Sequence, residues 1–187
     1  MTTVLDAVRL LRDRGSQVEL LLLGAPGRDS QAAENWLSKA RVRGVERALS
    51  FSGVLPAADL SNALAACDVL LHPEPGGPTS RKGTLAASLA SGSAVVALDG
   101  PRGWSELVRS EAVLVVRPTA VALGDALAGL LEDDAPREAL GARGAAFAEQ
   151  RMGVQRSAAV VVQLLGEVIP RPAPPSASSP SARVTAS

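Results

Sequence analysis

Helix-like and strand-like segments alternate along this sequence, and this alternation restricts the fold more than any other feature. An amphipathic helix that includes Val4, Val8 and Leu11 ends at Arg14-Gly15, and a buried strand over 17–23 follows it. Further strands are predicted at 50–53, 68–72, 94–98 and 112–116, and further helices at 31–40, 57–66, 82–91, 120–132, 135–150 and 154–165. This order is typical of a parallel sheet with helices on both faces, so the sequence predicts a three-layer, doubly wound α/β domain.

The chain divides into a predicted domain and a predicted tail. Its 187 residues fit one domain by size, and a hydrophobic content of 47% is enough for a core. The last residues are rich in Pro, Ser and Ala and contain too few apolar side chains to offset the entropy of ordering. We therefore expect a folded domain over 1–167 and a disordered tail over 168–187.

Composition excludes several classes of function. Lys plus Arg and Asp plus Glu both number 19, aromatic residues make up 2%, and there is no Tyr. A chain without a basic surface or aromatic stacking residues is not expected to bind nucleic acid. The single cysteine, Cys67, cannot form an internal disulfide or a structural zinc site, and its apolar surroundings predict a small buried side chain.

The amino-terminal segment has charged residues among its apolar ones, so it is predicted to be an amphipathic helix and not a signal peptide. No apolar run approaches the roughly 20 residues of a membrane span. We expect a cytoplasmic protein without a transmembrane segment.

The segment from His72 to Leu98 is the best candidate for a ligand site. It joins a strand end, a glycine-containing loop and a helix start, which is where open α/β sheets bind ligands. Gly76 and Gly77 would let the backbone approach a ligand closely, and free N–H groups at the helix start can hold phosphate oxygens. Further donors could come from Ser80, Arg81, Lys82 and Thr84.

The same residues also have a plain interpretation, in which Arg81 and Lys82 are solvated and the glycines only turn the chain. Against it, two cations at a helix amino end are unfavourable beside the helix dipole. Their position is better explained if an anion lies between them and the helix.

Five short motifs, in order along 4–165, resemble the C-terminal domain of glycosyltransferase family 4 enzymes. They are VELLLLGAPG, VERALSFSGVL, LAACDVLLHP, LAASLASGSAVVAL and GWSEL. Each motif is weak alone, but five in the family's order and spacing are fairly specific.

This resemblance implies a Rossmann-like domain that forms the donor-binding half of a GT-B fold. It implies transfer of a sugar from a nucleotide diphosphate sugar, with retention of configuration and without a metal or other cofactor. Cations and helix N–H groups would stabilise the leaving diphosphate as it gains charge. The donor's phosphates and sugar would lie at Gly76, Gly77, Ser80, Arg81, Lys82, Gly83 and Thr84.

The sequence departs from the family pattern where two glutamates with E-x7-E spacing are expected. Those positions hold Thr79 and Ala87, so the choice of donor stays open, although TSRKGT resembles a subgroup with a Ser-rich basic loop. Glu74 has the wrong spacing to replace either glutamate. His72 precedes a proline at a strand end without a suitably spaced carboxylate, so a structural role is expected for it. No catalytic residue is assigned.

A second departure concerns the first strand of the family domain, with its glycine turn and phosphate-clamping Arg and Lys, which has no counterpart here. In the strand order 3-2-1-4-5-6 this strand would lie between 17–23 and 68–72. We expect those two strands either to close up or to leave unpaired edges that weaken the fold, since each unsatisfied buried backbone group costs about 1–3 kcal/mol.

Three further residues lie in loops that could border the donor. They are Gly24 at a strand end, Asp99 at the start of DGPRGW, and Glu106 in the family's "E-l" position, and a surface or capping role explains each equally well. Trp104 is expected to anchor its loop to the core.

Three hypotheses about the whole chain follow. In the first, it is a shortened glycosyltransferase half that needs a separate amino-terminal half or a second copy, and has little or no activity alone. In the second, it is a non-catalytic nucleotide-binding or interaction module. In the third, it is an unrelated α/β protein such as a flavodoxin-like domain, which the fold alone does not distinguish from the first two.

Overall fold

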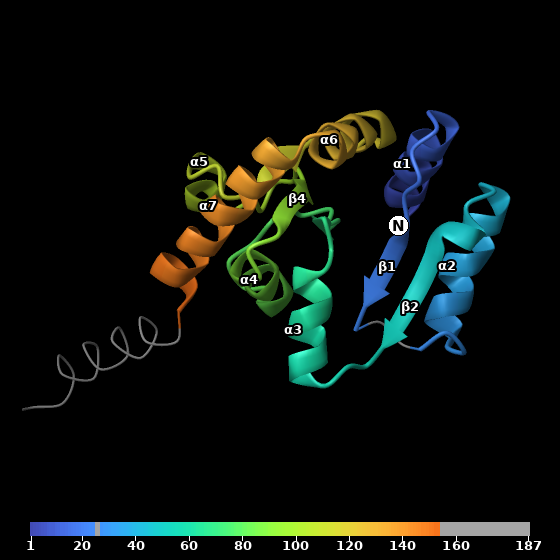
Figure 1. The fold of residues 1–187 in the computed structure, drawn as a ribbon, viewed down its shortest axis with the longest axis horizontal. Coiled ribbons are helices and arrows are strands. Elements are labelled where there is room, and N and C mark those ends of the chain that lie inside the picture. Colours follow the sequence, from blue (N-terminus) through green and yellow to red (C-terminus); the bar gives the residue numbers. More distant parts are fainter. Residues whose placement is uncertain (25–26, 154–187) are drawn as a thin grey trace, which may run out of the picture. The chain divides into compact units, whose positions relative to one another are not determined.

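The computed structural model describes residues 1–24 and 27–153, which follow the predicted alternation of strands and helices (Figure 1). The strands are β1 (Leu20–Leu23), β2 (Leu49–Gly53), β3 (Val69–His72), β4 (Ala94–Leu98) and β5 (Leu114–Val116). The helices are α1 (Thr2–Asp13), α2 (Gln31–Val42), α3 (Ala57–Ala65), α4 (Gly83–Ala90), α5 (Ser105–Arg109), α6 (Ala120–Glu132) and α7 (Asp134–Met152), with a 3-10 helix, η1 (Glu46–Ala48). The helix predicted at 154–165, the predicted boundary after 167 and the predicted tail lie outside the described residues.

The strands form two parallel sheets instead of one. β1 pairs with β2, while β4 lies between β3 and β5. Within the described residues, β1 pairs only with β2 and β3 pairs only with β4, so the other edge of each strand is unpaired. The doubly wound α/β class is confirmed, and the two strands predicted to flank the absent one do not close up.

The three-stranded sheet contains the main core, because every residue of its central strand β4 is buried. Ala94, Val96 and Leu98 pack on one face with residues of α1 and α6. Val95 and Ala97 pack on the other face with residues of α4, α5 and α7. A continuous apolar strand is what a parallel sheet covered on both faces requires.

The two-stranded sheet has a smaller core of its own. Leu5 and Val8 of α1 and Ala40 of α2 are buried there, with Leu20 of β1 and Leu49 of β2 packed against them. α1 therefore contributes to the cores of both sheets, and its packing against α6 is visible in Figure 1. An exposed ion pair between Arg14 and Asp125, 2.7 Å long, also joins these two helices.

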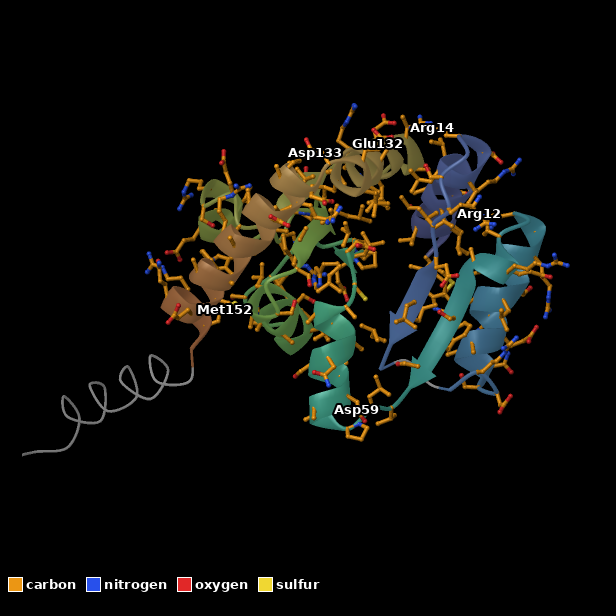
Figure 2. The ribbon with its side chains drawn as sticks, viewed as in Figure 1. Arg12, Arg14, Asp59, Glu132, Asp133 and Met152 are labelled. Atoms are coloured by element: carbon orange, nitrogen blue, oxygen red, sulfur yellow. The ribbon has the colours of Figure 1, made fainter. Side chains whose placement is uncertain are left out.

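Side-chain caps fix several helix starts, as expected for Ser, Thr and Asp at this position. Ser30 Oγ accepts a hydrogen bond from the Ala33 N–H at the start of α2, and Thr119 Oγ1 accepts one from the Ala122 N–H in α6. Asp133, labelled in Figure 2, ends α6 and caps α7 by accepting from the Ala135 N–H. The predicted break between these two helices is therefore confirmed.

Several element boundaries differ from the prediction. β1 begins at Leu20 and not at Gln17, because its ladder with β2 begins at Leu20 opposite Leu49. β5 likewise begins at Leu114, opposite Val96, although Ala112 and Val113 before it are buried. Helix α5 was not predicted, since five residues are too few to show a helical period.

The unpaired edges predict uneven amide hydrogen exchange. Amides of β4, buried and paired on both sides, should be the slowest to exchange, while amides of β1 and β3 without a partner in β2 or β4 should exchange much faster. Exchange measured by NMR or mass spectrometry tests this. Equal protection in β3 and β4 would mean that the edge of β3 is covered in solution.

Candidate functional site

Two loops meet at the carboxyl edge of the three-stranded sheet, and hydrogen bonds hold them together. Residues 73–82 connect β3 to α4, and residues 99–104 connect β4 to α5. The Arg102 N–H donates to the Gly76 carbonyl at 2.8 Å, and the Trp104 N–H donates to the Pro78 carbonyl at 2.7 Å. The site is therefore built from both loops as one unit.

The glycines of these loops allow the close approach. Gly76 and Gly77 are buried, and Gly77 has a φ of +83°, a conformation that other residues rarely adopt. A Cβ added at Gly77 would lie 3.1 Å from the backbone N and O of Gly100. The 99–104 loop is thus what approaches these glycines closely in the structure, and their role in donor binding stays a prediction.

An aromatic contact fixes the far end of the second loop. The ring of Trp104 packs edge-to-face against Phe147 of α7, with ring centroids 5.0 Å apart and an interplanar angle of 72°. This confirms the prediction that Trp104 anchors its loop to the core.

The amino end of α4 carries unpaired donors. Lys82 is its N-cap residue but makes no side-chain capping bond, and within the described residues the N–H groups of Gly83 and Thr84 have no acceptor. The residues Ser80, Arg81 and Thr84 are exposed, and within the described residues their side chains form no hydrogen bond or ion pair. Free helix N–H groups beside free polar side chains are suited to binding an anion.

Two cations lie at this helix end, and a third, which sequence analysis did not identify, lies beside Gly76 in the 73–82 loop. Lys82 Nζ lies 3.3 Å from Glu74 Oε1 in an exposed ion pair, and the exposed Arg81 is unpaired among the described residues. The third is Arg102, whose guanidinium lies so close to Gly76 that a Cβ there would be 2.6 Å from Nη2. Its position in a loop after β4, the strand next to β3, was the available signal.

His72 lies beneath this arrangement at the end of β3. Its side chain is buried with 6% exposed, and its Nε2 atom has no hydrogen-bond partner in the described structure. Burial lowers the pKa of His72, and the nearby Lys82 lowers it further against an opposing effect of Glu74. The imidazole is therefore neutral at pH 7.

The other predicted loop residues lie in different surroundings. Asp99 belongs to the site's second loop, where its Oδ1 accepts from the Gly100 N–H at 2.8 Å. Glu106 forms a 2.8 Å ion pair with Arg151 of α7. Gly24 ends β1 in the other sheet, where its N–H donates to Ser52 Oγ at 3.0 Å. Of these three residues, only Asp99 belongs to the two-loop site.

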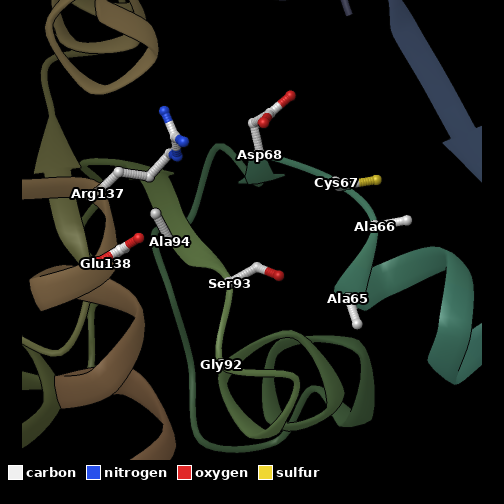
Figure 3. Close-up of a pocket in the computed structure, with 9 residues that line it drawn as sticks. All are labelled: Ala65, Ala66, Cys67, Asp68, Gly92, Ser93, Ala94, Arg137 and Glu138. Carbon is white, nitrogen blue, oxygen red and sulfur yellow. The ribbon is translucent and has the colours of Figure 1, made fainter. Parts of the chain in front are cut away.

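A shallow pocket of about 210 Å³ lies at the opposite edge of the sheet (Figure 3). It is lined by the residues that begin β3 and β4, including Asp68 and Ser93, and by Arg137 and Glu138 of α7. Arg137 is already bonded to the Leu130 carbonyl and to Asp134. Cys67, also in the lining, is only partly buried, so the prediction of a buried side chain is wrong in this respect. Its pKa is raised by burial and by Asp68, and its Sγ donates to the Ala63 carbonyl, which is typical of an unreactive cysteine.

Membrane-spanning helices and metal-binding clusters are both absent from the described residues. None of the described helices is both long enough and apolar enough to cross a membrane. No cluster of three or more His, Cys, Asp or Glu side chains in the part that the structure describes could hold a metal ion.

Comparison with known protein families gives one match, over residues 1–133, to the model described as glycosyl transferases group 1. This match covers more than two thirds of the chain and includes the whole of the two-loop site. Comparison with curated proteins gives no match.

Solved structures with the same fold include the following three proteins. HepE from Anabaena in complex with UDP has a TM-score of 0.72 at 23% identity, over 88% of this chain and 44% of that one. Sucrose-phosphate synthase from Thermosynechococcus elongatus has a TM-score of 0.71 at 19% identity, over 89% and 42%. The C-terminal domain of the group 1 glycosyl transferase LpcC from Francisella tularensis has a TM-score of 0.62 at 19% identity, over 82% and 79%. The chain spans less than half the length of the first two proteins.

Proposed function

Because this chain belongs to the glycosyl transferases group 1 family, we propose that it binds the nucleotide diphosphate sugar from which such an enzyme transfers the sugar. The diphosphate lies at the amino end of α4, beside the 73–82 loop. The observation that carries this proposal is the set of unpaired N–H groups at Gly83 and Thr84 beside the cations Arg81 and Lys82, with Arg102 against the same loop at Gly76. The UDP bound to HepE, a protein of the same fold, supports a uridine nucleotide as the first ligand to test.

The same groups have a chemical role in the proposed reaction. When the sugar leaves, negative charge grows on the diphosphate, and fixed donors and cations stabilise that charge without reorganising. We propose that this chain acts by such stabilisation, without a metal ion, and that the sugar retains its configuration as the resemblance to family 4 implies. No acid or base for the transfer is assigned to this chain.

The acceptor site and the rest of the catalytic machinery belong, in this proposal, to a second half. That half is another segment of the same protein, a separate polypeptide or a second copy of this chain. The structural similarity covers less than half of HepE and of sucrose-phosphate synthase. The described chain alone is therefore expected to bind nucleotide but to show little or no transfer.

A non-catalytic nucleotide-binding or interaction module is the second candidate. Two observations favour it: Thr79 and Ala87 replace the family's glutamates, and β1 and β3 leave edges unpaired. The two candidates differ in activity once the chain is combined with an amino-terminal half, since only the first predicts sugar transfer.

Thermal unfolding with and without nucleotides tests the proposed binding. A ligand that binds the native state raises its apparent stability. One of the three nucleotides UDP, GDP and ADP, the one with the preferred base, should therefore raise the melting temperature at millimolar concentration. The matching monophosphate should raise it less, because it lacks the second phosphate. A melting temperature indifferent to all three diphosphates would contradict the proposal.

Glu74 is expected to compete with the ligand for Lys82. Its carboxylate pairs with Lys82 in this structure, and the Glu74→Gln substitution would free the ammonium group to meet a phosphate. Because an exposed ion pair is worth at most about 1 kcal/mol, UDP should bind about two- to fivefold more tightly. Calorimetric titration at low salt measures this, and weaker binding by Glu74→Gln would show that Glu74 contributes to the site.

A further inference from the structure

The Nε2 atom of His72 is a buried polar group whose hydrogen bond is missing in the described structure. Buried polar atoms nearly always have partners, and an unsatisfied one destabilises the protein that carries it. An apolar side chain at this position would avoid that cost. A polar side chain at this position therefore calls for a partner that the described residues do not provide.

The fold places this side chain directly under the proposed site. Leu70 and His72 are the buried residues of β3, and Leu70 packs with Leu85 and Leu89 of α4. Since residues two apart in a strand share a face, His72 points toward the α4 side of the sheet. Burial lowers the pKa of His72, while Glu74 raises it and Lys82 lowers it.

We propose that His72 is a ligand-binding residue of this site, and that its Nε2 atom forms a hydrogen bond with an oxygen of the bound sugar diphosphate. This inference rests on the proposed function. A neutral imidazole with Nε2 protonated can donate to a phosphate or hydroxyl oxygen without the cost of a buried charge.

Contact with the ligand requires a local movement, because Nε2 is covered in this structure. The adjacent 73–82 loop is suited to move at the end that leads into α4, where Ser80, Arg81 and Lys82 are exposed. The Lys82 side chain is held there by one exposed ion pair with Glu74, and a phosphate would compete for it. In this inference, the ligand draws Lys82 away from Glu74, and the movement of the loop uncovers Nε2.

The unmodified chain allows a direct test, because His72 is its single histidine. The ¹⁵N and ring ¹H signals of one imidazole can be followed in the ¹⁵N-labelled chain during titration with UDP and with UDP-glucose. We expect a large change at Nε2 that saturates together with binding measured by calorimetry. Binding without a change at Nε2 would overturn the inference and leave the proposed function intact, whereas no binding of any nucleotide diphosphate would overturn both.

Substitution provides the second test. His72→Leu removes the unsatisfied atom, so it should keep or raise the melting temperature of the free chain while weakening UDP-glucose binding about tenfold. His72→Gln, which keeps a polar side chain, should recover part of the affinity. Unchanged affinity in His72→Leu would show that the histidine is only a core residue, and if that variant does not fold, the imidazole titration decides.

Discussion

Replacing Arg81 and Lys82 together with alanine is expected to weaken UDP binding about 50-fold. Hydrogen bonds to charged groups contribute about 1.5–3 kcal/mol each, and exposure at the end of α4 places these two at the lower end of that range. Their combined loss of about 2–3 kcal/mol corresponds to that change in affinity. The fold should be unaffected, because Arg81 has no partner within the described residues and Lys82 has only the exposed pair with Glu74.

The matched control is Lys39→Ala with Arg47→Ala, which removes the same charge from exposed positions on α2 and η1. Calorimetric titration should give this variant an affinity within about twofold of the unmodified chain at 0.15 M salt, since distant exposed charges are screened there. An equal loss in both variants would mean that only net charge matters and that the site assignment is wrong.

Gly100→Ala is expected to lower the stability of the chain by about 2–3 kcal/mol. A Cβ at this position would collide with backbone atoms of Gly76 and Gly77 and lie 2.5 Å from the Pro75 carbonyl oxygen. None of these atoms belongs to a flexible side chain, so the 73–82 and 99–104 loops would have to separate. Thermal unfolding should show a melting temperature lower by roughly 5–10 °C, and UDP affinity should fall as well.

Gly129→Ala is the matched control for this substitution. A Cβ at Gly129, in the last turn of α6, meets nothing within 4 Å, and alanine is the better helix former by up to about 1 kcal/mol. The same chemical change should therefore raise the melting temperature at 129 and lower it at 100. A Gly100→Ala variant as stable as the unmodified chain would show that the two loops are not packed together.

Elements with a strong local pattern could be predicted from the sequence. The apolar run Ala94–Leu98 and the capped helix Ala120–Glu132 have the predicted bounds, because each carries its own period and its own punctuation. β1 was predicted too long, since its start depends on where β2 lies opposite it. Register between strands that are far apart in sequence leaves no local signal.

The site could be predicted only in its local part. The order strand, glycine loop and helix led to Ser80, Arg81, Lys82 and Thr84, all of which lie at or just before the start of α4. Arg102 was missed because its approach to Gly76 joins loops 26 residues apart. The burial of Gly76 against Arg102 and the pairing of Glu106 with Arg151 are likewise tertiary contacts, which no spacing along the chain reveals.

The unpaired edges of β1 and β3 bear on the proposed complex with a second half. Each edge presents backbone groups without a partner in the described structure, while α1 packs in the cores of both sheets. Where such groups are buried, each costs about 1–3 kcal/mol, so pairing them would add to a stability that is typically 5–15 kcal/mol. A stable complex with an amino-terminal half would thus gain from completing the sheet as well as from forming the active site.

The most direct test of the binding proposal is a map of backbone amide shifts in the ¹⁵N-labelled chain during titration with UDP. Our account predicts that the largest changes occur at the free N–H groups of Gly83 and Thr84, while Gly92 and Ser93 at the opposite edge of the sheet stay unchanged. Saturable changes centred on the opposite edge, or no saturable change with any nucleoside diphosphate, would contradict the assignment of a diphosphate site to the amino end of α4.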